Sequence, residues 1–313
     1  RMIRDVYKFT GNTELIKYCK EAITVLLGRF ETYLGENGII DNPPDYMFVD
    51  WVVADGYSMH HPPKALGQTC LNAFYQFGLN AAAELMEIIG ENELCEKYKN
   101  EAARHKEAHN AALFDSEKGL YFDGLNTPTG SGKWLPENIS GRYYSKHANI
   151  LSVMSGLADG EKAVEIIERV MNEEFITDLQ PYFMHYLFEA LKKTGLYEKY
   201  AMGELRRWSV MTDKCKKGLQ EGWIKPQEDY SFDHSHAWGG TPAYQLPCAL
   251  LGFEMKEAGF KKISLTPNLF DLEFADISMP TPYGDIICKL KKGEQPVINI
   301  PDGIDWEVNY EKL

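Results

Sequence analysis

The sequence lacks the features that mark membrane, secreted or nucleic-acid-binding proteins. No apolar run approaches the roughly 18 residues that a membrane-spanning helix requires. The start of the chain carries no signal-peptide pattern and reads as the end of a helix. Basic residues are in the minority, with 33 Lys and Arg against 46 Asp and Glu and a net charge of −13. This balance argues against a nucleic-acid or anionic-membrane partner, because phosphate binding needs a basic surface.

The cysteines do not form a C-x-x-C pair, and most of them lie within apolar helical stretches. They are Cys19, Cys70, Cys95, Cys215, Cys248 and Cys288. This placement predicts buried free thiols rather than disulfides. It favours a cytoplasmic location over a periplasmic or secreted one, with a true N-terminus expected upstream of Arg1.

Through residues 1–255, apolar side chains recur every three or four positions, the spacing of amphipathic helices. We predict helices over residues 12–35, 64–90, 92–113, 142–156, 159–171, 179–195, 197–213 and 235–252. Short turns alternate with long, Gly- and Pro-rich loops at 36–62, 115–141 and 216–234. In a toroid of helical hairpins, the short turns lie on one face and the long loops build a site on the other. The absence of a fixed repeat length argues against a linear solenoid.

The pattern changes after Gly259, where short alternating or apolar runs are separated by turn signals. The runs cover residues 262–265, 272–275, 285–290, 296–300 and 306–308. They predict a small antiparallel β-sandwich module, too short to stand alone and therefore packed on the helices. We thus expect a helical domain over residues 1–255 and a β-domain over residues 256–313.

Several segments resemble bacterial α-L-rhamnosidases, and they occur in the order found in that family. Phe48-Val49-Asp50-Trp51 resembles the family's Phe-hydrophobic-Asp-Trp element. The other matching segments are Ser145-Lys146-His147-Ala148-Asn149, Pro181-Tyr182-Phe183, Ser235-His236-Ala237-Trp238-Gly239, Pro280-Thr281-Pro282-Tyr283-Gly284 and Ile300-Pro301-Asp302-Gly303. The resemblance implies a six-hairpin (α/α) barrel, an inverting mechanism, terminal rhamnose as substrate, and no metal or other cofactor.

Two departures from the family concern the catalytic groups. The family's general acid lies in an Asp- and Arg-rich segment ending in Gly-Trp, and the sequence contains no such segment. A closed barrel needs about twelve helices, and the pattern supplies about eight. The resemblance therefore implies that the first part of the barrel lies outside this sequence, upstream or in a companion chain or homodimer partner. At the base, the family usually has Thr-Thr-x-Trp-Glu, whereas this chain reads Gly218-Leu219-Gln220-Glu221.

Glu221 is the candidate general base. Inverting hydrolysis needs two carboxyl groups about 6.5–9.5 Å apart, with a water beside one of them. Glu221 lies in a Gly-flanked loop beside Trp223, where an apolar wall would tune a carboxyl group for proton transfer. The alternative is a solvated loop glutamate, with Glu228 and Asp229 as the next candidates.

The candidate substrate-binding residues are aromatic or polar, as expected for sugars, which present flat C–H faces and many hydroxyls. Asp50 and Trp51 would supply a hydroxyl acceptor and a stacking face; the alternative is a buried Trp with a capping Asp. His236 and Trp238 would line the ring site, or would lie in the core behind a Ser235 helix cap. Trp223 would line the site beside the base. Trp134, with Tyr143 and Tyr144, would form an aromatic wall.

Other patterns are weaker. His234-x-His236 lacks a third metal ligand at a suitable spacing. His105 and His109, with Glu101, have ligand spacing on one helix, but a partly buried or solvated helix face explains them better. We therefore predict no metal. The rival functions are another α/α-toroid enzyme of the phosphorylase or trehalase kind, or a carbohydrate-binding barrel without catalysis.

Overall fold

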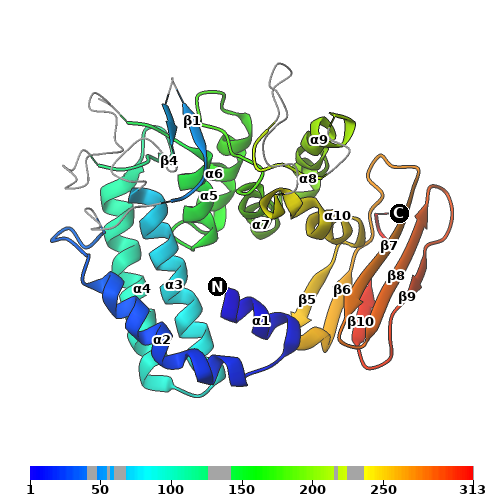
Figure 1. Ribbon diagram of the computed structural model, residues 1–313, viewed down its shortest axis with the longest axis horizontal. Coiled ribbons are helices and arrows are strands. Elements are labelled where there is room, and N and C mark those ends of the chain that lie inside the picture. The colour runs from blue at the N-terminus through cyan, green and yellow to red at the C-terminus, as the bar shows by residue number, and fades with distance from the viewer. Residues whose placement is uncertain are drawn as a thin grey trace.

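The structure is a computed structural model that describes residues 1–40, 48–54, 57–59, 68–125, 142–214, 218–223 and 236–312. Its helices follow an arc that ends at two small β-sheets, with the N-terminus on the inner side of the arc (Figure 1). This arrangement confirms the predicted helical toroid, present in part, followed by a β module.

Apart from the first, the α-helices lie in the segments that the apolar spacing predicts. They are α1 (Met2–Thr10), α2 (Glu14–Glu31), α3 (Gln68–Ile88), α4 (Asn92–Leu113), α5 (Lys146–Met154), α6 (Gly160–Asn172), α7 (Met184–Lys193), α8 (Tyr197–Leu205), α9 (Ser209–Lys214) and α10 (Thr241–Leu251). Two predicted helices are interrupted. A 3₁₀ turn, η1 (Arg206–Trp208), separates α8 from α9, and another, η2 (Ala237–Gly240), precedes α10. A third 3₁₀ turn, η3 (Ala258–Phe260), follows the helical part.

Glycine makes the short turns between paired helices possible. Gly90, between α3 and α4, has a φ of 77°, and Gly195, between α7 and α8, has a φ of 72°. This left-handed conformation is strained for residues with a Cβ, so glycine ends each helix and lets the next one return alongside it. The turns predicted at these two positions are therefore confirmed.

Short hairpins lie within the long connections. β1 (Val52–Ala54) pairs with β2 (Tyr57–Met59), and β3 (Phe114–Asp115) pairs with β4 (Leu120–Tyr121), both antiparallel. The first hairpin follows directly on Trp51, and the second ends three residues before Gly124. In the sequence, one hairpin precedes α3 and the other follows α4.

The C-terminal module contains two three-stranded sheets. One has the order β7 (Phe274–Thr281), β8 (Gly284–Lys291), β9 (Val297–Asn299), and all its pairings are antiparallel. The other has the order β10 (Asp305–Val308), β6 (Lys262–Leu265), β5 (Glu254–Glu257). Here β10 runs parallel to β6, which departs from the purely antiparallel module expected. Strand β5 also crosses the expected boundary at residue 255, and the division into two domains stays a prediction.

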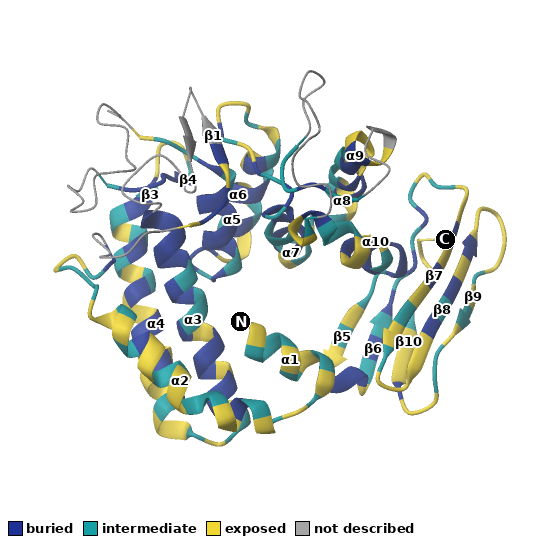
Figure 2. Ribbon diagram, in the orientation of Figure 1, coloured by how far each residue is buried: buried dark blue, intermediate teal, exposed yellow. Residues whose placement is uncertain are grey.

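Buried side chains form three clusters. One lies among α5, α6, α7 and α8, one among α2, α3 and α4, and one inside the β module. Figure 2 shows the buried residues where neighbouring helices pack against one another, whereas α1 and α2 are mostly exposed or intermediate. Leu250 and Leu251 of α10 belong to the third cluster, so the β module packs on the helices as predicted.

The cysteines that the structure describes are free thiols. Cys70, Cys95, Cys248 and Cys288 are buried and Cys19 is partly exposed, while Cys215 lies outside the described residues. The prediction of buried thiols holds for these four. Among the described helices, none has the length and apolar character needed to cross a bilayer.

Candidate active site

Three predicted residues from distant parts of the chain meet at one carboxylate. The indole Nε1–H of Trp51 donates a hydrogen bond to Oε1 of Glu221 at 2.7 Å. Nε2 of His236 lies 4.0 Å from the same oxygen. The side chains of Glu221 and His236 are 23% and 28% exposed, so a molecule in solution can reach both. The structure therefore joins the candidate base to two candidate substrate ligands.

Backbone contacts fix the segment that carries Glu221. The N–H of His236 donates to the carbonyl oxygen of Leu219 at 2.8 Å, which ties residues 218–223 to the start of η2. Gly239 lies against the same segment, and a Cβ at Gly239 would stand 2.5 Å from the carbonyl oxygen of Gln220. Only glycine permits this approach. The irregular chain around Glu221 thus has a defined position.

Aromatic side chains form a wall beside the carboxylate. Trp238 is 38% exposed, and its ring lies 4.6 Å from that of Tyr182 and 5.5 Å from that of Phe48. The ring of His236 meets Trp238 edge-on at 5.0 Å. Trp238 is therefore not a core residue, which was the alternative to its predicted role. Tyr182 was not predicted at the site, although the Pro181-Tyr182-Phe183 match to the family could have indicated it.

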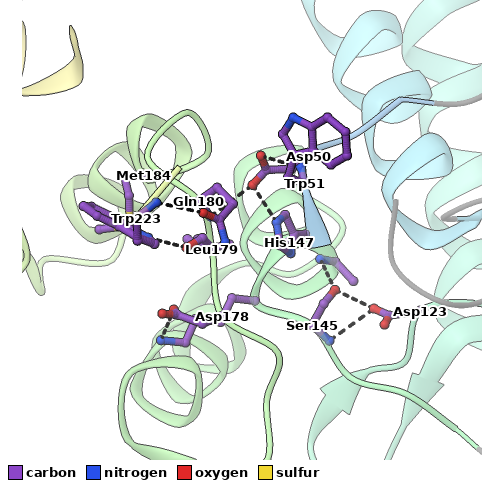
Figure 3. Close-up of polar contacts among 12 residues, drawn as sticks. Asp50, Trp51, Asp123, Ser145, His147, Asp178, Leu179, Gln180, Met184 and Trp223 are labelled. Atoms are coloured by element: carbon purple, nitrogen blue, oxygen red, sulfur yellow. Dashed lines mark hydrogen bonds and ion pairs between the residues drawn. The ribbon is translucent and has the colours of Figure 1, made fainter. Parts of the chain in front are cut away.

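Asp50 does not lie on the surface of the site, contrary to expectation. Its side chain is 1% exposed, and both of its oxygens accept hydrogen bonds. Oδ1 accepts from the backbone N–H of Trp51 at 2.9 Å. Oδ2 lies 2.9 Å from Nε2 of His147 and accepts from the backbone N–H of Gln180 at 3.2 Å (Figure 3). A carboxylate buried in this way anchors its neighbours and is not open to a sugar hydroxyl.

Trp223 also differs from its predicted role as a substrate wall. Its indole N–H donates to the carbonyl oxygen of Leu179 at 2.6 Å, and its backbone N–H donates to Oε1 of Gln180 at 3.2 Å (Figure 3). The guanidinium carbon of Arg207 lies 4.4 Å from the centre of its ring, and Trp208 packs against it. Because its polar atom and a ring face are already occupied, Trp223 holds the loop in place.

Asp178 strengthens the same region through two cations. Its carboxylate pairs with Lys146 at 2.9 Å and with Arg207 at 2.7 Å. Burial raises the pKa of Asp178, but the two cations together outweigh it and hold the pKa at about 2. Asp178 is therefore charged at neutral pH and orients the guanidinium that covers Trp223.

The remaining candidates lie elsewhere or outside the described residues. Trp134, Glu228, Asp229 and His234 are not among the residues that the structure describes. The hydroxyl of Tyr144 donates to Oδ2 of Asp115 at 2.6 Å, so it stabilises the β3–β4 hairpin. Tyr143 is partly buried, and its carbonyl oxygen accepts the N–H of Asp123 at 2.8 Å.

His105 and His109 are core residues, 3% and 0% exposed, so they are neither solvated nor partly buried. Nδ1 of His105 lies 2.7 Å from Oε1 of Gln76, and Nε2 lies 2.9 Å from Oδ1 of Asn72. Among the described residues, no group of three or more His, Cys, Asp or Glu side chains has the geometry of a metal site.

Comparison with known families identifies the helical part. Residues 1–249 match the model of the bacterial alpha-L-rhamnosidase 6 hairpin glycosidase domain. The chain belongs to this family. No curated protein sequence matched the chain.

Solved structures of rhamnosidases share the fold along almost the whole chain. The GH78 family rhamnosidase of Bacillus sp. GL1 has a TM-score of 0.80 and 21% identity, covering 98% of this chain and 32% of its own. The α-L-rhamnosidase from Dictyoglumus thermophilum has a TM-score of 0.71 and 17% identity, covering 98% and 33%. The Streptomyces avermitilis α-L-rhamnosidase complexed with L-rhamnose has a TM-score of 0.72 and 15% identity, covering 97% and 28%.

This chain thus spans about a third of the length of the solved rhamnosidases that it resembles. Residues 1–249 match the family's helical domain, and the likeness to the solved structures extends through the β module.

Proposed function

We propose that this chain supplies the general base of a glycoside hydrolase that cleaves terminal α-L-rhamnosides with inversion at the anomeric carbon. The observation that carries the proposal is the partly exposed Glu221 carboxylate, held by the Trp51 indole beside the aromatic wall of Trp238, Tyr182 and Phe48. Membership of the rhamnosidase family supports the choice of sugar.

In this proposal, Glu221 removes a proton from the water that attacks the anomeric carbon. Because Oε1 accepts the indole hydrogen of Trp51, the carboxylate has a fixed orientation and Oε2 can take the proton. His236, 4.0 Å from Oε1, would bind a hydroxyl of the sugar or the attacking water. Trp238 would pack against the apolar face of the sugar ring.

The reaction also needs a general acid to protonate the departing oxygen. It must stand about 6.5–9.5 Å from the base in an inverting enzyme. The family resemblance puts it in the Asp- and Arg-rich segment ending in Gly-Trp, which this sequence does not contain. A homodimer partner or companion chain as its source, and a cytoplasmic location, stay predictions.

The test uses protein that includes the complete barrel and an aryl α-L-rhamnoside as substrate. We expect Glu221→Gln to lower kcat by about 10³-fold or more, since the base is removed while the shape is kept. The matched control is Glu173→Gln, at a surface ion pair with Arg169, which should leave kcat unchanged.

Two further measurements define the mechanism. Azide needs no base to attack, so it should restore turnover in Glu221→Gln, and NMR should show inversion at the anomeric carbon of the first product. Wild-type kcat in Glu221→Gln would remove Glu221 from the mechanism. Sugar binding without turnover by the wild type would favour a carbohydrate-binding barrel, and a phosphate requirement would favour a phosphorylase.

A further inference from the structure

We propose that His147 is a positioning residue for Glu221, acting through the Asp50 carboxylate. This inference rests on the proposed role of Glu221 as the base. His147 touches neither Glu221 nor the exposed aromatic wall in the contacts described above, so its effect on the reaction would be indirect.

The position of His147 is fixed from the start of α5. Ser145 is the N-cap of this helix, and its hydroxyl oxygen accepts the N–H of Ala148 at 3.1 Å. His147 therefore lies in the first turn, where it is 0% exposed and packs 4.6 Å from the ring of Phe183. A side chain confined in this way has little freedom to change its rotamer.

The His147 ring and Asp50 form a directed pair. Oδ2 of Asp50 is an acceptor, so Nε2 of His147 carries the hydrogen at their 2.9 Å contact. The same carboxylate accepts backbone N–H groups from Trp51 and Gln180. Three donors from three separate segments thus converge on Asp50, and His147 is the side chain among them.

Both backbone partners of Asp50 reach the loop that holds the base. Trp51 donates its indole hydrogen to Oε1 of Glu221. Gln180 accepts the backbone N–H of Trp223, two residues after Glu221, through its Oε1. The carboxylate of Asp50 is therefore linked to the loop at two points, at Glu221 itself and two residues after it.

Removing His147 would leave a buried carboxylate without its side-chain donor. Asp50 would then have to rotate or admit water, because an under-bonded buried carboxylate is costly. Either response shifts Trp51 and Gln180, and with them the Glu221 carboxylate. A displacement of this kind lowers the rate of the proton transfer more than it weakens substrate binding.

We expect His147→Ala to lower kcat about 10- to 100-fold, as loss of a supporting partner does at other sites, with KM changed less than about threefold. His147→Gln, which can present an N–H toward Asp50, should recover most of the loss. The matched control is His105→Gln, another buried histidine, which should keep kcat. Thermal unfolding of each variant shows whether a lower activity comes from less folded protein or from a lower kcat.

Two more variants connect the effect to the base. Trp51→Phe removes the indole N–H at the surface, and combining it with His147→Ala should cost little more than the worse single change. In azide-rescued Glu221→Gln, adding His147→Ala should not lower the rate further. Additive losses in both combinations, or wild-type kcat in folded His147→Ala, would overturn the inference.

The failure of this inference can be told from failure of the proposed function. If Glu221→Gln is inactive while His147→Ala keeps its kcat, Glu221 remains the base and His147 has only a structural role. If Glu221→Gln keeps wild-type kcat, the base assignment itself fails, whatever His147→Ala does.

Discussion

Two buried polar clusters in this protein are built around histidines and differ in what their hydrogen bonds reach. In the Asp50 cluster (Asp50, His147, Gln180 and Trp51), the histidine pairs with a carboxylate and the contacts lead outward to Glu221. In the His105 cluster (Asn72, Gln76 and His105), the histidine pairs with neutral amides, and the contacts lead to backbone groups of Ile40 and Gln68.

The hydrogen bonds of Asn72 determine the protonation of His105. The amide nitrogen of Asn72 donates to the carbonyl oxygens of Ile40 and Gln68, both at 2.8 Å, so its oxygen must face His105. Nε2 of His105 is then the donor. A neutral ring has Nδ1 as an acceptor, so the Gln76 amide, whose Oε1 lies 2.7 Å from Nδ1, must turn its nitrogen toward the ring. Burial lowers the pKa of His105 to about 4, consistent with a neutral ring.

The difference shows that the partner of a buried histidine, and not its burial, indicates its role. Both His147 and His105 are buried, 0% and 3% exposed. A carboxylate partner makes a polar, directed link that can hold a reacting group in place. Amide partners in an uncharged cluster instead satisfy the backbone where a helix meets a loop.

The largest effect that would sharpen this comparison is on stability. Asn72→Ala should lower the free energy of unfolding by about 5 kcal/mol, because it leaves the N–H and C=O of Ile40 and Nε2 of His105 buried without partners. Folded molecules should keep their kcat, since no hydrogen bond among the described residues links the His105 cluster to Glu221. Urea unfolding measures the free energy of unfolding, and rates divided by the concentration of folded enzyme measure kcat.

Asn80 provides the control for that prediction. It lies on the same helix, and its Nδ2 donates to the carbonyl oxygen of Ser155 at 2.7 Å. Asn80→Ala should cost about 1 kcal/mol. Equal losses for the two variants, or a lower kcat in folded Asn72→Ala, would break the distinction between the clusters.

A second buried carboxyl, Asp123, is a counterpart to Asp50 without the histidine. Its Oδ1 accepts the hydroxyl and N–H hydrogens of Ser145 at 2.5 and 3.1 Å, and Oδ2 has no partner among the described residues. Burial raises the pKa of Asp123 to about 7, in spite of these two hydrogen bonds. Asp123 thus differs from Asp50 because, among the described residues, no side-chain N–H donates to it.

Asp123 should make stability depend on pH. Its folded-state pKa lies above the unfolded value, so the folded protein binds more protons between pH of about 4 and 7. The stability that Asp123 contributes is full below that window and is lost as the pH rises through it. Asp123→Asn stays neutral, so its stability relative to the wild type should increase by up to about 4 kcal/mol from pH 4 to pH 8. A difference that stays constant over this range would contradict the raised pKa.

The sequence predicted most of the helices and the strands from residue 262 onward because apolar spacing and turn residues are local signals. It also predicted Glu221, Trp51, His236 and Trp238, and these do converge. It could not predict that Asp50 is buried, since that depends on His147 and Gln180, which lie 97 and 130 positions away. The same limit applies to Trp223, whose ring is covered by Arg207, and to the parallel pairing of β10 with β6.

The smallest expected effect concerns His105 and has the opposite sign to that of Asp123. The folded-state pKa of His105, about 4, lies below the unfolded value of about 6.5. The unfolded chain therefore binds more protons in this window, and stability is lost as the pH falls from 6.5 to 4. His105→Gln cannot be protonated, so its stability relative to the wild type should increase by up to about 3 kcal/mol as the pH falls from 7 to 4. Chemical denaturation at several pH values measures this difference. A relative stability that falls over this range would mean that His105 is charged in the folded protein, contrary to its lowered pKa.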